Sequence, residues 1–319
     1  MREIGGYIEI DEYSLPMLHE EAIKLNTARN CLAYLIEKKK IVSIALPKFL
    51  CDSVSQVCRE RGVEIHYYSI DTNFEPVDMD LEDGVWLYVV NYYGLIDNTN
   101  ILELKRKYGN LIIDNVQAYY QKPVEGVDTI YTCRKFFGVP DGAFLYTDLN
   151  MDEELEQDYS YERIRHLLGR YEKSALDFYD EYVMEEKLFS RQPIMKMSKL
   201  TYNMLHAIDY DKVKNKRIEN FKCLYSGLAD INQLKFHKLM ECPFAYPLFI
   251  KDGNAIRKML QQNKIYVPTL WPDVFHVCKE SDVEYQMAEN ILPLPIDQRY
   301  SVQDMDYVIT ILRKCLSVQ

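Results

Sequence analysis

Lys135 is the residue whose type and position best suit covalent chemistry. It follows a β-prone run, 129–131, and precedes a turn-forming stretch, 138–142, after which a second β-prone run begins. A lysine between a strand and a tight return can be held rigidly in a pocket. Desolvation there lowers the pKa of the amine and makes it nucleophilic. Taken alone, a lysine at a strand end is more often a solvated surface charge.

Asp114 supplies a carboxylate upstream of this lysine. It directly follows the apolar run 111–113, at the carboxyl end of an expected strand, where open α/β sheets bind their ligands. An aspartate in this place could also be a helix N-cap. Together, Asp114 and Lys135 form the pair that pyridoxal phosphate (PLP) enzymes need. The lysine forms a Schiff base with the cofactor, and the aspartate keeps the pyridinium nitrogen protonated.

Alternating strand and helix patterns surround these two residues. We expect strands at 41–46, 63–68, 85–90 and 111–113, with a helix from about residue 101 to 108. Repetition at this spacing predicts a parallel, doubly wound sheet. Further along, a long amphipathic helix is expected from residue 208 to 228. Short strands are expected at 7–10, 243–250 and 265–267.

Three segments resemble a known group of enzymes. They are Val-Asn-Tyr-Tyr-Gly at 90–94, Ile-Ile-Asp-Asn-Val-Gln-Ala at 112–118, and 134–142, where Arg-Lys is followed by Asp-Gly. They resemble fold-type-I, aspartate-aminotransferase-like enzymes, and most closely the DegT/DnrJ/EryC1/StrS family of sugar-nucleotide aminotransferases. The resemblance runs from about residue 25 to the C-terminus. It implies an α/β fold with a mostly parallel large-domain sheet and a smaller C-terminal α/β domain. The implied division is a short N-terminal segment (1–24), a PLP-binding large domain (25–190) and a smaller domain with its connecting helix (191–319).

The resemblance places the cofactor phosphate at the start of a helix expected near residue 28. Free N–H groups at a helix N-terminus bind anions. By this resemblance the phosphate role falls on Thr27 and Ala28, with Arg29 nearby. Thr132, three residues before the lysine, matches a hydroxyl that binds the same phosphate. A simply capped helix and an ordinary strand threonine are the alternatives.

The resemblance also implies contacts to the cofactor ring. A side chain just past Pro47 packs on the ring in the family: Phe49 offers an aromatic face, whereas strict spacing points to Cys51. Gln117 would reach the 3-oxygen of the cofactor or the substrate. A core phenylalanine and a solvent-facing glutamine are the alternatives.

Two features depart from the family pattern. The longer N-terminal section that usually precedes the cofactor domain is largely missing. Ile194 stands where the family has an asparagine that reaches the cofactor phosphate of the partner subunit. We therefore expect that this contact is made by another residue or is absent.

The resemblance implies a PLP-dependent aminotransferase acting as a homodimer. Its amino donor would be an amino acid, with glutamate expected, and its acceptor a keto-sugar linked to a nucleotide. A PLP dehydratase on the same fold would have histidine in place of Lys135. The alternative function is a catalytically altered or inactive fold relative that binds a sugar nucleotide.

Composition and sequence motifs narrow the classes of partner, compartment and cofactor that this protein could have. A formal net charge of −11 argues against nucleic acid or an anionic membrane as partner. No apolar run approaches the ~18 residues of a membrane span. The eight cysteines include no Cys-x-x-Cys, and no secretory leader is evident, so we expect a cytoplasmic protein with reduced thiols and no metal site. The chain has no Gly-x-Gly-x-x-Gly and no P-loop, which leaves nicotinamide and P-loop ATP chemistry without their usual signatures.

Overall fold

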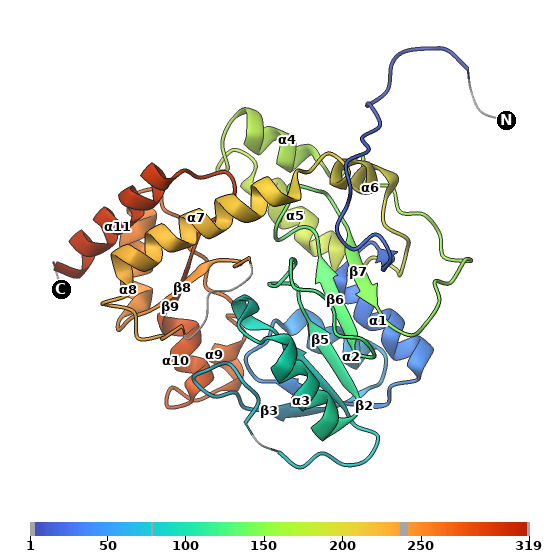
Figure 1. Ribbon diagram of the computed structural model, residues 1–319, viewed down its shortest axis with the longest axis horizontal. Helices are drawn as coiled ribbons and strands as arrows, with labels where there is room; N and C mark the ends of the chain where they lie inside the picture. The colour runs from blue at the N-terminus through green and yellow to red at the C-terminus, as the bar shows by residue number, and fades with distance from the viewer. Residues whose placement is uncertain (1–3, 78, 237–241, 318–319) are drawn as a thin grey trace.

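A seven-stranded β-sheet forms the centre of the computed structural model, which describes residues 4–77, 79–236 and 242–317 (Figure 1). The strand order is β1-β7-β6-β5-β4-β2-β3. The strands from β2 to β6 run parallel to their neighbours, whereas β7 is antiparallel to both β6 and β1. The expected mostly parallel sheet is therefore confirmed. The strands are β1 Ile23–Leu25, β2 Ser43–Pro47, β3 Glu64–Tyr68, β4 Trp86–Val90, β5 Leu111–Asp114, β6 Asp128–Thr132 and β7 Ala143–Tyr146.

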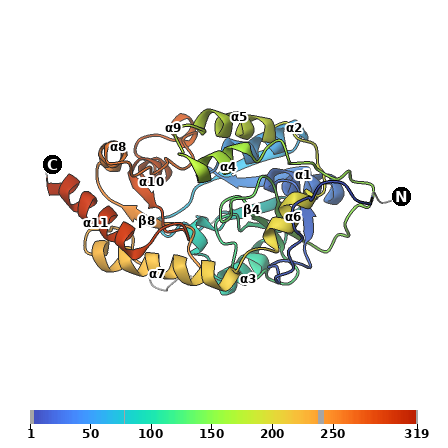
Figure 2. The ribbon, with the colours of Figure 1, turned by 90° about the horizontal axis from the view of Figure 1, so that it is seen from above.

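Helices cover both faces of this sheet. α1 (Ala28–Lys39) and α2 (Asp52–Glu60) lie on one side, and α3 (Asn98–Tyr108) lies on the other (Figure 2). α1 begins at Thr27, whose side chain accepts a hydrogen bond from the backbone N–H of Asn30 at 3.1 Å. α3 begins in the same way at Asp97, which accepts from the N–H groups of Thr99 and Asn100. These polar caps thus fix the residue at which each helix begins.

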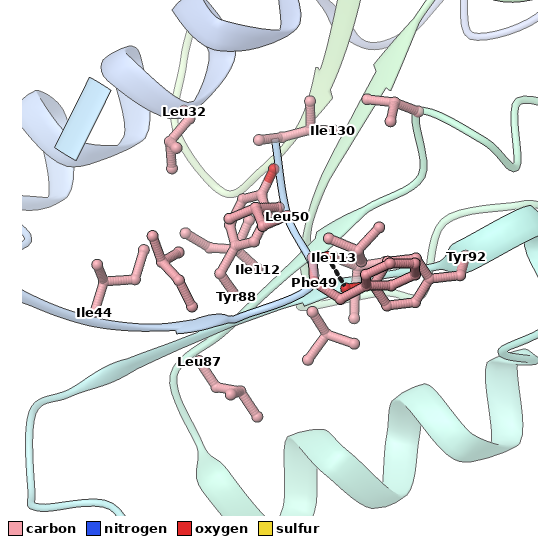
Figure 3. Close-up of a cluster of buried hydrophobic side chains, with 14 of the residues drawn as sticks. Leu32, Ile44, Phe49, Leu50, Leu87, Tyr88, Tyr92, Ile112, Ile113 and Ile130 are labelled. Atoms are coloured by element: carbon pink, nitrogen blue, oxygen red, sulfur yellow. Dashed lines mark hydrogen bonds between the residues drawn. The ribbon is translucent and has the colours of Figure 1, made fainter. Parts of the chain in front are cut away.

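The core around this sheet lies on both of its faces: in Figure 3, Leu32 of α1 lies on one side of the strands and Leu87 lies on the other. Apolar side chains of neighbouring strands, among them Ile44, Leu87 and Ile112, are all but fully buried. The short 3₁₀-helix after β4 (Tyr92–Gly94) packs against this core, and the hydroxyl of Tyr92 donates to the carbonyl oxygen of Phe49 at 2.5 Å. This bond links the chain leaving β2 to the chain leaving β4, at the edge where the parallel strands end.

The C-terminal part builds a second core around two antiparallel strands, β8 (Tyr246–Phe249) and β9 (Ile291–Leu294). α7 (Tyr210–Leu228) and α11 (Val302–Ser317) pack against each other beside them (Figure 1). The Ser301–Asp304 pair that precedes α11 is reciprocal: the N–H of Ser301 donates to the Asp304 carboxylate, and the Asp304 N–H donates back to the Ser301 hydroxyl. The remaining helices of this part are α8 (Gly253–Gln262), α9 (Val274–Val277) and α10 (Val283–Asn290).

Three helices connect the two parts. α4 (Arg165–Glu172) and α5 (Tyr179–Phe189) pack on each other, and α6 (Lys199–Leu205) follows. An ion pair of 2.5 Å between Arg134 and Glu186 attaches α5 to the loop that carries Lys135. The helical pair α4–α5 therefore lies beside the residue that the sequence singles out.

Two expected strands are wrong. Residues 7–10 form no strand: Tyr7 and Ile8 are more than nine-tenths exposed and have no strand beside them. Residues 265–267 are irregular, because Lys264 has a left-handed backbone (φ 60°) and Pro268 has no N–H to donate to a sheet. Within the described ranges, no helix combines the length and the apolar character that crossing a bilayer requires.

Candidate active site

The carboxyl ends of β4, β5 and β6 bring the candidate residues to one edge of the sheet. Val90, the last residue of β4, pairs with Asp114, the last residue of β5, and Asp114 pairs with Ile130 of β6. Lys135 follows β6 by three residues. Residues that are far apart in sequence are therefore adjacent here because parallel strands end at the same edge.

Asp114 is buried, with only 5% of its surface exposed. Its Oδ2 accepts a hydrogen bond from the hydroxyl of Tyr88 at 2.7 Å, and its Oδ1 accepts from the N–H of Val116 at 2.9 Å. Burial raises the pKa of Asp114, while the Lys135 amine and then these two donors oppose the rise. Asp114 thus lies inside the protein with each oxygen fixed by one donor.

Lys135 is exposed and forms part of the lining of a cavity. Desolvation lowers the pKa of Lys135, and the negative charge of Asp114 is the largest influence that opposes the lowering. The amine also lies 5.9 Å from the centre of the Phe244 ring. A lysine with a lowered pKa carries more neutral, nucleophilic amine near pH 7 than a surface lysine does.

The turn after Lys135 is held by Gly142 and Cys133. The N–H of Cys133 donates to the carbonyl oxygen of Gly142 at 3.0 Å. Gly142 has φ +107°, and a Cβ at this position would lie 2.9 Å from the Thr201 methyl group and 3.1 Å from the Cys133 sulfur. Only glycine suits this conformation and this close approach.

Asp141 joins the turn to the start of α6. Its carboxylate accepts hydrogen bonds from the Ser198 N–H (2.8 Å) and hydroxyl (2.7 Å), and from the Thr201 hydroxyl. Burial raises the pKa of Asp141, and the Ser198 and Thr201 donors oppose this rise. The Asp-Gly pair that follows the lysine is thus a structural anchor, and Ser198 caps α6.

The N-terminus of α1 faces the same region. Asn26, just before the cap, accepts a hydrogen bond at its carbonyl oxygen from the Gly142 N–H at 2.7 Å. Thr27 is buried, whereas Ala28 and Arg29 are partly exposed. The charge of Arg29 also acts on the Lys135 amine, where it contributes to lowering the pKa. The structure therefore brings the three expected phosphate residues close to the lysine turn.

Phe49 and Cys51 have different surroundings. Phe49 is 1% exposed and lies among the rings of Phe74, Tyr92 and Trp271. Cys51 is exposed at the start of α2, and its sulfur is close enough to Lys135 to act on the pKa of the amine. Of the two candidates, the position of Cys51 is the better one for contact with a group bound at Lys135.

Gln117 and Thr132 are both buried beside the pair. The Gln117 Oε1 accepts a hydrogen bond from the Tyr93 N–H at 2.8 Å, which ties it to the 3₁₀-helix after β4. The Thr132 hydroxyl donates to the carbonyl oxygen of Gly142 over a long 3.4 Å. Ile194 packs against the large-domain core, so its side chain is directed toward the protein interior.

A cavity of about 580 Å³ lies over Lys135. Its lining comprises residues of α4 and α5, including His166, Arg170 and Tyr182, together with Arg217 and the segment 297–299. Within the described residues, no group of three or more histidine, cysteine or acidic side chains is arranged to hold a metal ion. The cavity is large enough for a small organic molecule, and its lining includes Lys135 but none of the other residues expected to contact the cofactor.

Several of these residues escape sequence analysis. In the sequence, Tyr88 looks like an ordinary strand tyrosine. Because it lies two residues before Val90, the last residue of the strand, the two side chains share one face of the sheet, which could have placed Tyr88 near the strand end. Arg170 belongs to a polar helical stretch that gives no sign of facing a cavity. Arg217 and the segment 297–299 reach the site only through the packing of the C-terminal part.

The donor set suits PLP. The lysine amine has a lowered pKa and faces a cavity. Asp114 uses one lone pair on each oxygen for Tyr88 and Val116, which leaves further lone pairs for a pyridine N–H. The first turn of α1 carries no acidic residue, so its N–H groups are suited to a phosphate.

Comparison with known proteins shows the fold. No family model matches the chain, and no curated protein matches it in sequence. The aminotransferase TlmJ from Streptoalloteichus hindustanus is similar in structure, with a TM-score of 0.65 and 17% identity over 94% of this chain and 86% of that chain. A DegT DnrJ EryC1 StrS aminotransferase from Brucella abortus has a TM-score of 0.62 and 12% identity over 92% and 85%. The sugar aminotransferase Spr1654 from Streptococcus pneumoniae, in its PLP form, has a TM-score of 0.63 and 14% identity over 93% of this chain and 89% of that chain. The chain thus has the fold of sugar aminotransferases, as its motifs predict.

Proposed function

We propose that this chain, which has the fold of sugar aminotransferases, is a PLP-dependent aminotransferase. It moves an amino group from an amino acid, with glutamate as the expected donor, to a keto-sugar linked to a nucleotide. The fold supports the reaction class, and the acceptor comes from the similarity to sugar aminotransferases. The protein acts in the cytoplasm as a homodimer.

One observation carries the proposal. The Lys135 amine has a lowered pKa, faces a cavity of about 580 Å³, and lies within electrostatic reach of the buried carboxylate of Asp114. A structural lysine is normally solvated or paired with a carboxylate on the surface. A desolvated lysine at the base of a cavity is suited to bond formation with a carbonyl group.

The residues that would hold PLP come from three strand ends and one helix. Lys135 would bind it covalently, and Asp114 would accept a hydrogen bond from its ring nitrogen. Thr27, Ala28, Arg29 and Thr132 would bind the phosphate, while Cys51, with Phe49 behind it, and Gln117 would contact the ring and its substituents. When bound, PLP supplies an electron sink that stabilises negative charge on the substrate carbon.

Proton transfer would fall to Lys135. Once the incoming amino donor has displaced it from the cofactor, its neutral Nζ can take a proton from the donor carbon and return it two atoms along, on the far side of the transferred nitrogen. The lowered pKa favours both directions near neutral pH. Asp114 would act as an anion opposite the amine. Tyr88 and the Val116 N–H hold its carboxylate in a fixed orientation. The cavity beside α4–α5 would receive both substrates in turn.

Borohydride trapping tests the proposal. The purified protein is incubated with PLP, reduced with borohydride, digested, and analysed by mass spectrometry. We expect the added mass on the peptide that contains Lys135. Lys135→Met should lose it, and Lys258→Met, which removes an exposed lysine on α8, should keep it.

A second measurement tests the reaction itself. Glutamate added to the PLP-loaded protein should release 2-oxoglutarate in a single turnover, without any sugar present. Absence of a Lys135 adduct at saturating PLP would end the aminotransferase proposal. Binding of a nucleotide sugar under those conditions would instead support a non-catalytic relative of the same fold.

A further inference from the structure

The cavity over Lys135 is positively charged, although the whole chain carries a formal charge of −11. Its lining includes one acidic side chain, Asp297. The basic side chains that line it are Arg134, Lys135, Arg170, Arg217 and Arg299. A positively charged cavity in a protein of negative net charge concentrates anions in that cavity.

Two of these cations are neutralised by carboxylates. Arg134 pairs with Glu186 at 2.5 Å and lies over the Phe189 ring. Arg299 makes two bonds to Asp297, of 2.6 and 2.9 Å. Their charge is largely used within the protein, so they contribute little to an additional anion site.

Arg217 is charged and fixed in place. It is 1% exposed, donates to the carbonyl oxygen of Phe244 at 3.1 Å and to Gln298 at 3.2 Å, and lies over the Phe136 ring. Gln298 in turn donates to the carbonyl oxygen of Phe136, the residue after the lysine. Arg217 thus provides a rigid positive centre behind the cavity.

Arg170 is a further exposed cation of the lining. It lies in the last turn of α4, and across residues 4–77, 79–236 and 242–317 no carboxylate is within ion-pair distance of its guanidinium. Burial raises the pKa of Tyr182, and Arg170 is among the positive charges that oppose the rise, so the guanidinium lies near this ring. Arg165 on the same helix is different: it is 77% exposed, is not part of the cavity lining, and pairs with Glu181 at 3.5 Å.

We propose that Arg170 binds an oxyanion that the substrate carries at a distance from the atom that reacts at Lys135. Arg217, fixed in the lining of the same cavity, adds to the attraction. A guanidinium suits this role because its planar donors match the oxygens of a phosphate or a carboxylate. The oxyanion can be a phosphate of the nucleotide-linked sugar or the second carboxylate of the amino donor. The inference rests on the proposed function, since it places the reacting end of the substrate at Lys135.

Isothermal titration calorimetry with two simple anions tests this. Pyrophosphate represents the phosphate source and glutarate the dicarboxylate source. We expect the wild-type protein to bind at least one of them, and Arg170→Gln to weaken that binding by about 10-fold or more. Arg165→Gln is the matched control from the same helix and should bind within about 2-fold of wild type. Thermal unfolding of each variant checks that the fold is retained.

The outcomes are distinct. A loss limited to pyrophosphate supports the phosphate source, and a loss limited to glutarate supports the carboxylate source. Equal affinity of wild type and Arg170→Gln, no binding of either anion at millimolar concentration, or an equal loss in Arg165→Gln overturns the proposal. Borohydride trapping separates this failure from that of the proposed function: a Lys135 adduct formed by Arg170→Gln retains the aminotransferase proposal, whatever the anion titrations give.

Discussion

The hydroxyl of Tyr88 on β4 lies 2.7 Å from Oδ2 of Asp114 on β5, and both side chains are buried. The two strands are parallel neighbours, and Val90 is the residue in register with Asp114. Tyr88 therefore comes from the strand next to Asp114 and donates a bond that favours the charged form of the carboxylate. We regard Tyr88 as a positioning residue for Asp114.

Tyr88→Phe should shift the pH dependence of activity. Removing the donor raises the pKa of Asp114 further. Because Asp114 would act as an anion in the proposed reaction, the loss of activity on acidification should begin at a higher pH than in the wild type. The measurement is kcat/KM against pH. Tyr34→Phe removes a buried hydroxyl that bonds to the carbonyl oxygen of Asn150 instead, and should leave the profile in place. An unshifted profile in Tyr88→Phe would contradict the positioning role.

Asp114→Asn should reduce turnover by about 100-fold or more while the protein still binds PLP at Lys135. The amide keeps the size of the side chain but removes the negative charge that faces the amine and the ring nitrogen. Single-turnover release of 2-oxoglutarate measures the loss. Asp128→Asn is the control. Asp128 is equally buried, but it pairs with Lys39 at 2.8 Å and is the first residue of β6, whereas Asp114 is the last residue of β5. Similar losses in both variants would indicate a general effect of buried carboxylates.

Gly142→Ala should lower the free energy of unfolding by about 1–3 kcal/mol. The new Cβ would lie 2.9 Å from the Thr201 methyl group, and the backbone has φ +107°. Gly126→Ala is a matched control, since Gly126 also has a positive φ (+74°) but no atom within 4 Å of the added Cβ. Urea denaturation should show the larger loss for Gly142→Ala. Equal losses would mean that the close contact of the new Cβ with Thr201 of α6 does not destabilise the fold beyond the effect of the positive φ.

His19 should make stability fall on acidification. Burial lowers its pKa to about 4 from 6.5, so between these values the unfolded chain binds a proton that the folded chain does not. Stability is therefore lost as the pH decreases from about 6.5 toward 4, by about 3–4 kcal/mol in total. His19→Gln should flatten this dependence in urea titrations at each pH. His276→Gln, at an exposed position of α9, should keep the wild-type slope.

The sequence identified the central pair because strand ends are visible in it. The apolar run before Asp114 and the two runs that flank Lys135 are buried strands, and parallel pairing of β5 with β6 then brings the residues together. The mostly parallel sheet follows from the same alternation of strands and helices. The spacing of apolar residues and the residue types that form turns are local properties, so a single sequence displays them directly.

Other parts of the site depend on packing that no local pattern reveals. Phe49 and Cys51 lie two residues apart in a loop, and only the aromatic cluster around Phe49 shows which one is buried. Arg170 becomes part of the cavity because α4 packs on α5 beside the lysine turn. The expected strand at 265–267 is wrong because Pro268 and the left-handed Lys264 outweigh β propensity.

The bonds around Asn26 have a consequence for synthesis of the chain. Asn26 accepts from Gly142 and donates from its own N–H to the carbonyl oxygen of Met195, while Asp141 binds Ser198 and Thr201. The lysine turn is thus held between a segment translated early and one translated much later. On the ribosome, the strands of the sheet can pair before α6 emerges, but the cavity over Lys135 is completed only when the C-terminal part that supplies Arg217 and the segment 297–299 has left the exit tunnel. The candidate active site therefore becomes available for cofactor late in translation, after most of its own residues are already in place.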